Sequence, residues 1–146
     1  MNMKLKQLSL FLENKPAHLK GPCKVLAQAG IDILTLTLAD TDQFGILRLI
    51  VHDWKKAVAA LEQAGHVVKV TDVVAVEVEN RPGGLLDVLE IVDAAGLNID
   101  YTYAFTFGRG NRAVMVFRFA DPDAAIVALQ TRGIAVLDGL ALQGHA

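Results

Sequence analysis

Cysteine is nearly absent from this sequence of 146 residues, in which Cys23 is the single example. One cysteine excludes an intramolecular disulfide and a cysteine-cluster metal site. The four histidines also lack the i, i+4 spacing that is typical of helical metal sites. The sequence therefore predicts neither a structural metal nor a cofactor.

An excess of either charge is missing as well, because 14 basic residues stand against 16 acidic ones. This near balance provides no broad basic surface for nucleic acid and no polybasic segment for anionic lipid. No uncharged apolar run approaches the roughly 18 residues that span a bilayer, and residues 1–12 alternate between polar and apolar instead of forming a signal peptide. We expect a cytoplasmic protein without nucleic-acid or membrane partners.

What the sequence does contain is an internal repeat. The segment Glu13–Pro16 returns as Glu79–Pro82, and the Ala-Gly pair that begins at Ala29 returns at Ala95. Self-similarity of this kind indicates a tandem duplication. We expect two domains, residues 1–70 and 71–146.

Each copy carries the same order of strand and helix signals. Apolar runs with strand periodicity predict the strands Leu8–Leu12, Ile33–Ala39, Ile46–Val51 and Val67–Val70 in the first copy, and Val74–Val78, Ile99–Phe107, Ala113–Phe119 and Ile134–Leu137 in the second. A helix is expected after the first and third strands of each copy. The order βαββαβ predicts an α+β fold of two ferredoxin-like repeats, each an antiparallel four-stranded sheet with two helices on one face.

The expected helices have recognisable faces and ends. In the second copy Leu85, Leu89 and Val92 recur at helical spacing and predict the buried face of its first helix. Asp53 and Asp121 are natural N-caps for the second helix of each copy.

The turn Asn80–Leu85, between a strand and a helix of the second copy, is the strongest candidate for a binding site. Pro82 fixes the chain direction, and Gly83 and Gly84 let a ligand approach the backbone closely. The free N–H groups in the first turn of a helix carry partial positive charge and bind anions. Because the turn matches neither the dinucleotide fingerprint nor the phosphate loop, a carboxylate is the expected anion.

Asparagines flank this helix, with Asn80 before it and Asn98 after it. A carboxamide both donates and accepts, so two of them can bind the carboxylate and the ammonium of a free amino acid. Asparagines near turns can also serve only local backbone groups. The recurrence of the pair as Asn14 and Asp32 in the first copy favours the binding interpretation.

These motifs resemble ACT domains. In each copy an Asn-Lys-Pro or Asn-Arg-Pro turn precedes a helix that ends in Ala-Gly and is followed by Ile-Asp-Ile or Leu-Asn-Ile, and the second copy is similar to the regulatory domain of phosphoglycerate dehydrogenase. The resemblance implies a non-catalytic regulatory protein, a homodimer that senses a free amino acid at interfaces between ACT domains. The ligand-binding residues expected from the turn and the resemblance are Asn80, Arg81, Pro82, Gly83, Gly84, Leu85, Asn98 and Ile99 in the second copy, and Asn14, Pro16, Ala17, His18, Leu19, Asp32 and Ile33 in the first.

The two copies differ at this turn. Ala17 and His18 stand where the second copy has Gly83 and Gly84, and Pro22 falls inside the expected first helix. Proline is comfortable only in the first turn of a helix, so this helix is expected to begin late or to be distorted. We rank the second site above the first, and we interpret His18 as a partly exposed turn residue, with ligand contact as the alternative.

Aromatic residues gather in one hairpin of the second copy, namely Tyr101, Tyr103, Phe105, Phe107, Phe117 and Phe119. The first four alternate along a strand, and we expect the last two to extend the same face onto the neighbouring strand. The stripe is interpreted as core or intersubunit packing, with a pocket wall as the alternative. The charged residues around it, Glu77, Glu79, Arg109 and Arg112, are expected to be solvated.

Other functions also occur among small α+β proteins. The alternative to a stand-alone sensor is a regulatory subunit of a separate amino-acid biosynthetic enzyme, as small ACT proteins are for acetolactate synthase. An RNA-recognition module would need stacking aromatics on its first strand, where this sequence has Val74, Val76 and Val78. The sequence has no convincing nucleophile–base pair, so we do not expect an enzyme.

Overall fold

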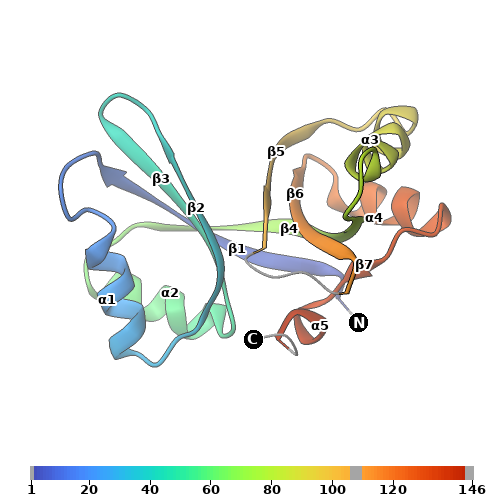
Figure 1. The fold of residues 1–146 in the computed structure, drawn as a ribbon. Helices are drawn as coiled ribbons and strands as arrows, with labels where there is room; N and C mark the ends of the chain where they lie inside the picture. The colour runs from blue at the N-terminus through green and yellow to red at the C-terminus, as the bar shows by residue number, and fades with distance from the viewer. Residues whose placement is uncertain (1, 106–109, 144–146) are drawn as a thin grey trace. The chain divides into compact units, whose positions relative to one another are not determined.

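The computed structural model describes residues 2–105 and 110–143 and divides the chain into two compact units (Figure 1). The first unit is Lys6–Thr71, and the second contains the chain from Asp72 onward together with the described residues before Lys6. Each unit has the predicted order of strand, helix, two strands, helix and strand. Phe107, Arg109 and the expected strand end at residues 106–107 lie outside the described residues.

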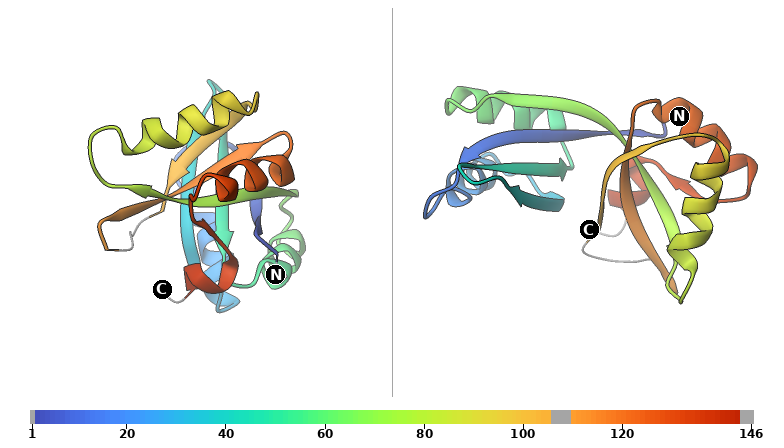
Figure 2. Two further views of the ribbon diagram at one scale, coloured as in Figure 1. Left: turned by 90° about the vertical axis from the view of Figure 1, so that its right-hand side faces the viewer. Right: turned by 90° about the horizontal axis from the view of Figure 1, so that it is seen from above.

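The first unit is an antiparallel sheet with two helices packed on one face (Figures 1 and 2). Its elements are β1 (Lys4–Glu13), α1 (Lys20–Gln28), β2 (Ile33–Asp40), β3 (Phe44–Val51), α2 (Trp54–Gln63) and the beginning of β4 (Val68–Glu79). The strand order is β2-β3-β1-β4. Alternate residues of β1, Leu8, Leu10 and Leu12, point to the helices and meet Leu26 of α1 and Leu61 of α2 in the core.

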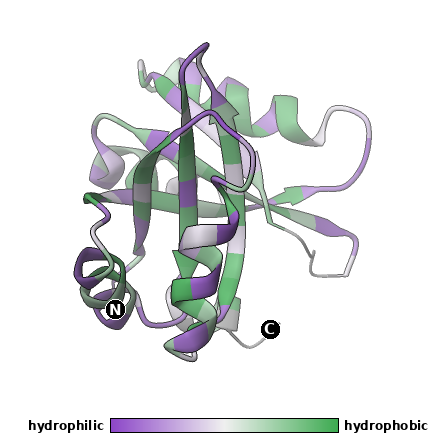
Figure 3. Cartoon of the chain, turned by 90° about the vertical axis from the view of Figure 1, so that its left-hand side faces the viewer, coloured by the Kyte–Doolittle hydropathy of each residue, from purple (hydrophilic) through white to green (hydrophobic). Residues whose placement is uncertain are grey.

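The second unit repeats this arrangement with the remainder of β4. Its further elements are α3 (Gly84–Ala94), β5 (Ile99–Ala104), β6 (Arg112–Phe119), α4 (Pro122–Thr131), β7 (Val136–Leu137) and α5 (Gly139–Gln143). The order β5-β6-β4-β7 is that of a ferredoxin-like sheet. Figure 3 shows strands coloured mainly as hydrophobic and several loops coloured as hydrophilic, in agreement with the pattern that predicted them.

Strand β4 differs from the expectation of two separate strands. Val68–Glu79 is one strand that includes Thr71 and Asp72, which lie between the expected strands Val67–Val70 and Val74–Val78. The segment contains neither glycine nor proline, and β-branched residues dominate it, so nothing in its local sequence ends a strand. Helix α5 was not anticipated, because its five residues are too short for a periodic signal.

The expected helix ends are confirmed. The side chains of Asp53 and Asp121 each accept a hydrogen bond from a backbone N–H three residues ahead, at 3.2 and 3.1 Å. Helix α1 begins at Lys20, two residues later than α3 begins in the repeat, so Pro22 lies in its first turn. This late start confirms the prediction made from proline geometry. Of the described helices, none is long and apolar enough to cross a membrane.

The expected common face of the aromatic stripe is wrong. Phe117 lies opposite Thr102, and Tyr103 lies opposite Val116. Because directly opposite residues share a face, the buried Phe117 and Phe119 face the helices, on the other side of the sheet from Tyr101 and Tyr103. The alternation was read correctly within each strand, but the register between them is set by the hairpin.

The expected buried face of α3 is right for Val92, which is buried, and for Leu89, which packs against the core, but wrong for Leu85, which is 37% exposed. Gly84 and Val88 are the other buried residues of the helix. Gly84 packs directly against the backbone of β4, which turns Leu85 outward.

Candidate functional site

The turn that joins β4 to α3, residues Glu79–Leu85, is called here the second corner. The backbone N–H of Asn80 donates to the carbonyl of Asn111 at 2.9 Å, which ties the corner to the start of β6. Within the corner, the N–H of Arg81 donates to Glu79 and that of Gly84 to Arg81, both at 3.0 Å. These three bonds fix the asparagine at the end of the strand.

The first corner, residues Glu13–Leu19 between β1 and α1, repeats these bonds. The N–H of Asn14 donates to the carbonyl of Gln43 at 2.9 Å, in the hairpin before β3. The N–H groups of Lys15 and His18 donate to Glu13 and Lys15 at 2.9 and 3.3 Å. The duplication has therefore preserved the backbone path as well as the residues.

The corners also share a left-handed residue. Gly83 has a φ of 84°, and Ala17 at the same place in the first corner has a φ of 69°. An alanine in this region is strained, because its Cβ approaches the following carbonyl. The first corner thus keeps the turn at an energetic cost that the second avoids.

We expect Ala17→Gly to raise the free energy of unfolding, by less than about 1 kcal/mol, since relief of the left-handed strain exceeds the added entropy of the unfolded chain. Ala27→Gly, on the exposed side of α1, is the control and should lower it by about 1 kcal/mol. Urea denaturation of both variants measures whether the free energy of unfolding rises or falls. A lower midpoint for Ala17→Gly would show that the turn is unstrained.

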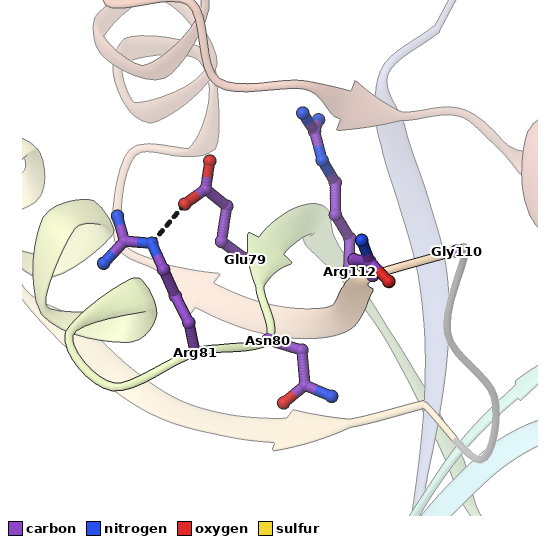
Figure 4. Close-up of a pocket in the computed structure, with 6 residues that line it drawn as sticks. Glu79, Asn80, Arg81, Gly110 and Arg112 are labelled. Carbon is purple, nitrogen blue, oxygen red and sulfur yellow. Dashed lines mark hydrogen bonds and ion pairs between the residues drawn. The ribbon is translucent and has the colours of Figure 1, made fainter.

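A cavity of about 480 Å³ lies at the second corner (Figure 4). It is lined by Glu79, Asn80, Arg81, Gly110, Asn111 and Arg112. In Figure 4 the carboxamide of Asn80 points away from the Glu79–Arg81 pair. Within the described part of the chain this carboxamide makes no hydrogen bond, so both its donor and its acceptor are available to a ligand.

The charged side chains of the second corner form ion pairs. The Arg81 guanidinium donates to Glu79 and to Asp87, and these hydrogen bonds, that to Glu79 first, raise the pKa of Arg81 above its ordinary value. Arg112 donates to Glu77 at 3.1 Å. The expectation of solvated charges is wrong for Glu77, whose side chain is 12% exposed, whereas the side chains of Glu79 and Arg112 are 54% and 51% exposed. The described wall of the cavity has nearly balanced charge.

The first turn of α3 presents free donors beside this corner. Gly83 offers no side chain to cap the helix. In the described structure the backbone N–H groups of Leu85 and Leu86 make no hydrogen bond. Such donors carry partial positive charge, as expected for a site that binds a carboxylate.

Asn98 and Ile99 line a separate cavity of about 420 Å³ between α3 and β5. Asn98 donates from Nδ2 to Asp100 at 3.2 Å. Apolar side chains of α3, Leu86 and Leu89 among them, form much of this cavity. The described cavities thus do not bring Asn80 and Asn98 together.

The remaining expected site residues lie as follows. Gly84 lines a third cavity of about 110 Å³, while Pro82, Gly83 and Leu85 line none of the three described cavities.

The first-copy residues line none of these cavities either. Asn14, Pro16 and Ala17 are exposed, and His18 Nδ1 lies 2.6 Å from the carbonyl oxygen of Lys15. Leu19 and Ile33 pack against the core, and the N–H of Asp32 donates to Nδ1 of His52 at 2.9 Å.

Sequence reasoning missed Asn111 and Gly110 as cavity residues. They enter the site through the pairing of Glu79 with Arg112 across β4 and β6. The repeat contained a signal for Asn111, because this residue aligns with Gln43 of the first copy. No group of three or more metal-ligating side chains occurs among the described residues.

Two ferredoxin-like units that repeat one asparagine corner define a tandem of small α+β domains. The chain belongs to the ACT domain pair family, whose model matches residues 3–139. ACT domains are regulatory and not catalytic.

Solved structures include similar chains. Protein BT0572 from Bacteroides thetaiotaomicron is 39% identical, with a TM-score of 0.89 over 96% of each chain. The regulatory subunit of aspartate kinase from Thermus thermophilus, in its ligand-free form, shares the fold at 18% identity, with a TM-score of 0.65 over 88% of this chain and 92% of that one. No curated protein matches this sequence.

Proposed function

We propose that this protein is a non-catalytic sensor that binds a free amino acid, with residues 1–70 and 71–146 as its two ACT domains. The unpaired carboxamide of Asn80, held beside a cavity by a backbone bond to Asn111, is the observation that carries the proposal. Membership of a regulatory family supports it.

The second corner and the adjoining first turn of α3 offer both kinds of group that a zwitterion needs, with Leu85 and Leu86 outside the cavity that Asn80 lines. The free N–H groups of Leu85 and Leu86 suit a carboxylate, while the Asn80 carboxamide oxygen can accept from an ammonium. Because Arg81 and Arg112 are already paired with carboxylates, the described residues of the wall offer no free cation for a second negative charge. The arrangement favours a ligand of zero net charge over an acidic amino acid.

We expect Asn80→Ala to weaken amino-acid binding by about 1–3 kcal/mol, because the ligand loses a hydrogen bond to the carboxamide. Isothermal titration calorimetry with each of the twenty amino acids measures this loss. Gln63→Ala, an exposed amide at the end of α2, is the control and should bind like the parent. Absence of heat with every amino acid would contradict the proposal.

A regulatory subunit of a separate biosynthetic enzyme is the second candidate. Its support is the fold shared with the regulatory subunit of aspartate kinase from Thermus thermophilus. Affinity purification of the tagged chain from its native cell tests it, since a stoichiometric enzyme partner should be recovered. In either case we propose a homodimer, because β2 and β5 end their strand orders and leave edges able to pair. We also propose that the protein is cytoplasmic.

A further inference from the structure

Besides Ala17 and His18, the two corners differ in one pair of side chains on the neighbouring strands. In the second unit Glu77 of β4 and Arg112 of β6 form an ion pair at 3.1 Å, and the Glu77 side chain is only 12% exposed. Arg112 is itself part of the cavity wall. This wall is therefore polar and charge-balanced.

Phenylalanine occupies both equivalent positions in the first unit. Glu13 lies opposite Phe44 as Glu79 lies opposite Arg112, and Phe11 comes two residues before Glu13 as Glu77 comes two before Glu79. The register is the same, so a diagonal ion pair has been replaced by a diagonal aromatic pair.

Both phenylalanines are exposed. Phe11 is 68% exposed and Phe44 is 47% exposed. Large apolar surface left in water is unfavourable, and a ligand that covers it gains the corresponding free energy. An ion pair at the same place would instead lose its hydration when an apolar group covered it.

The polar part of the first corner is retained beside these rings. Asn14 keeps its backbone bond to Gln43, and in the described structure its carboxamide makes no hydrogen bond. Lys15 remains paired with Glu13 at 3.3 Å, as Arg81 is with Glu79. The first corner thus keeps the asparagine with a different surface for the side chain, and it differs at the start of the helix, because the N–H of Lys20, at the place of Leu86, donates to Ala17 at 3.2 Å.

We infer that the two corners take different amino acids, and that the first takes one with a large apolar side chain, which packs on Phe11 and Phe44. This inference rests on the proposed function, because it assumes that the corners bind amino acids. The second corner, with its ion pair, takes a ligand with a polar or small side chain.

The test is calorimetry on the full chain with leucine, isoleucine, methionine and phenylalanine, and with serine, threonine, asparagine and glutamine. An apolar amino acid should bind, and Phe44→Ala and Asn14→Ala should each weaken it by about tenfold or more, while Asn80→Ala leaves it unchanged. The double variant Phe11→Glu with Phe44→Arg installs the ion pair of the second corner. It should abolish binding of the apolar ligand and leave the ligand of the second corner unaffected.

Val127→Ala, which removes an exposed apolar side chain of α4, is the matched control and should change neither ligand. Thermal melting of each variant confirms that it is folded. If an apolar ligand is weakened by Asn80→Ala instead of Asn14→Ala, or if ligands bind only at the second corner, this inference is wrong and the proposed function stands. If no amino acid binds, both the inference and the proposed function are wrong. The same conclusion holds if no amino acid binds and the double variant changes only the oligomeric state.

Discussion

Gly84→Ala is expected to lower the free energy of unfolding by about 2–4 kcal/mol. A Cβ at this position would lie 1.9 Å from the carbonyl oxygen of Glu79 and 2.9 Å from its carbonyl carbon. Both atoms belong to the backbone of β4, so no side chain can rotate away. The strand end and the first turn of α3 must separate, which displaces Asn80.

Gly21→Ala is the control for this prediction. Gly21 lies in α1, and no atom outside the neighbouring residues and the helix's own backbone lies within 4 Å of the Cβ that alanine would add. Alanine is the better helix former, but the ring of Pro22 disfavours a helical backbone at a preceding residue with a Cβ, so this variant should change the free energy of unfolding by less than about 1 kcal/mol. Guanidinium denaturation compares the two variants, and equal midpoints would show that the second corner yields without cost.

Most of the fold was predictable because its signals are local. Alternation along β1 and within each copy's hairpin, the caps Asp53 and Asp121, and Pro22 in α1 each act within a few residues. The continuous β4 and the separate faces of Phe117 and Tyr103 were not predictable in this way. A domain boundary need not break a strand, and cross-strand register depends on a hairpin that the alternation of one strand does not encode.

Part of the site was predictable because its signals are also local. The path of the second corner follows from Pro82, Gly83 and the repeat, which are adjacent in sequence. The cavity, in contrast, needs Asn111 and Arg112, which reach it only through the pairing of β4 with β6. The ion pairs of Arg81 and Arg112 likewise depend on side-chain positions that spacing alone does not fix.

Phe117→Ala is expected to have the largest effect on stability, a loss of about 3–5 kcal/mol. Phe117 is fully buried, lies opposite Val74 across β4 and β6, and stacks on Phe119 with ring centroids 5.8 Å apart. Removing the ring leaves a cavity between the sheet and its helices, and the stacked partner loses its contact.

Phe11→Ala removes the same side chain from an exposed position and is the matched control, with an expected change within about 0.5 kcal/mol. Chemical denaturation of both variants compares a phenylalanine held by the core with one free to contact a ligand. Similar losses in the two variants would mean that Phe11 is covered in the native protein, and its surface would then be unavailable to an amino acid. A large difference means that Phe11 contributes little to folding, which leaves binding as the property to measure at the first corner.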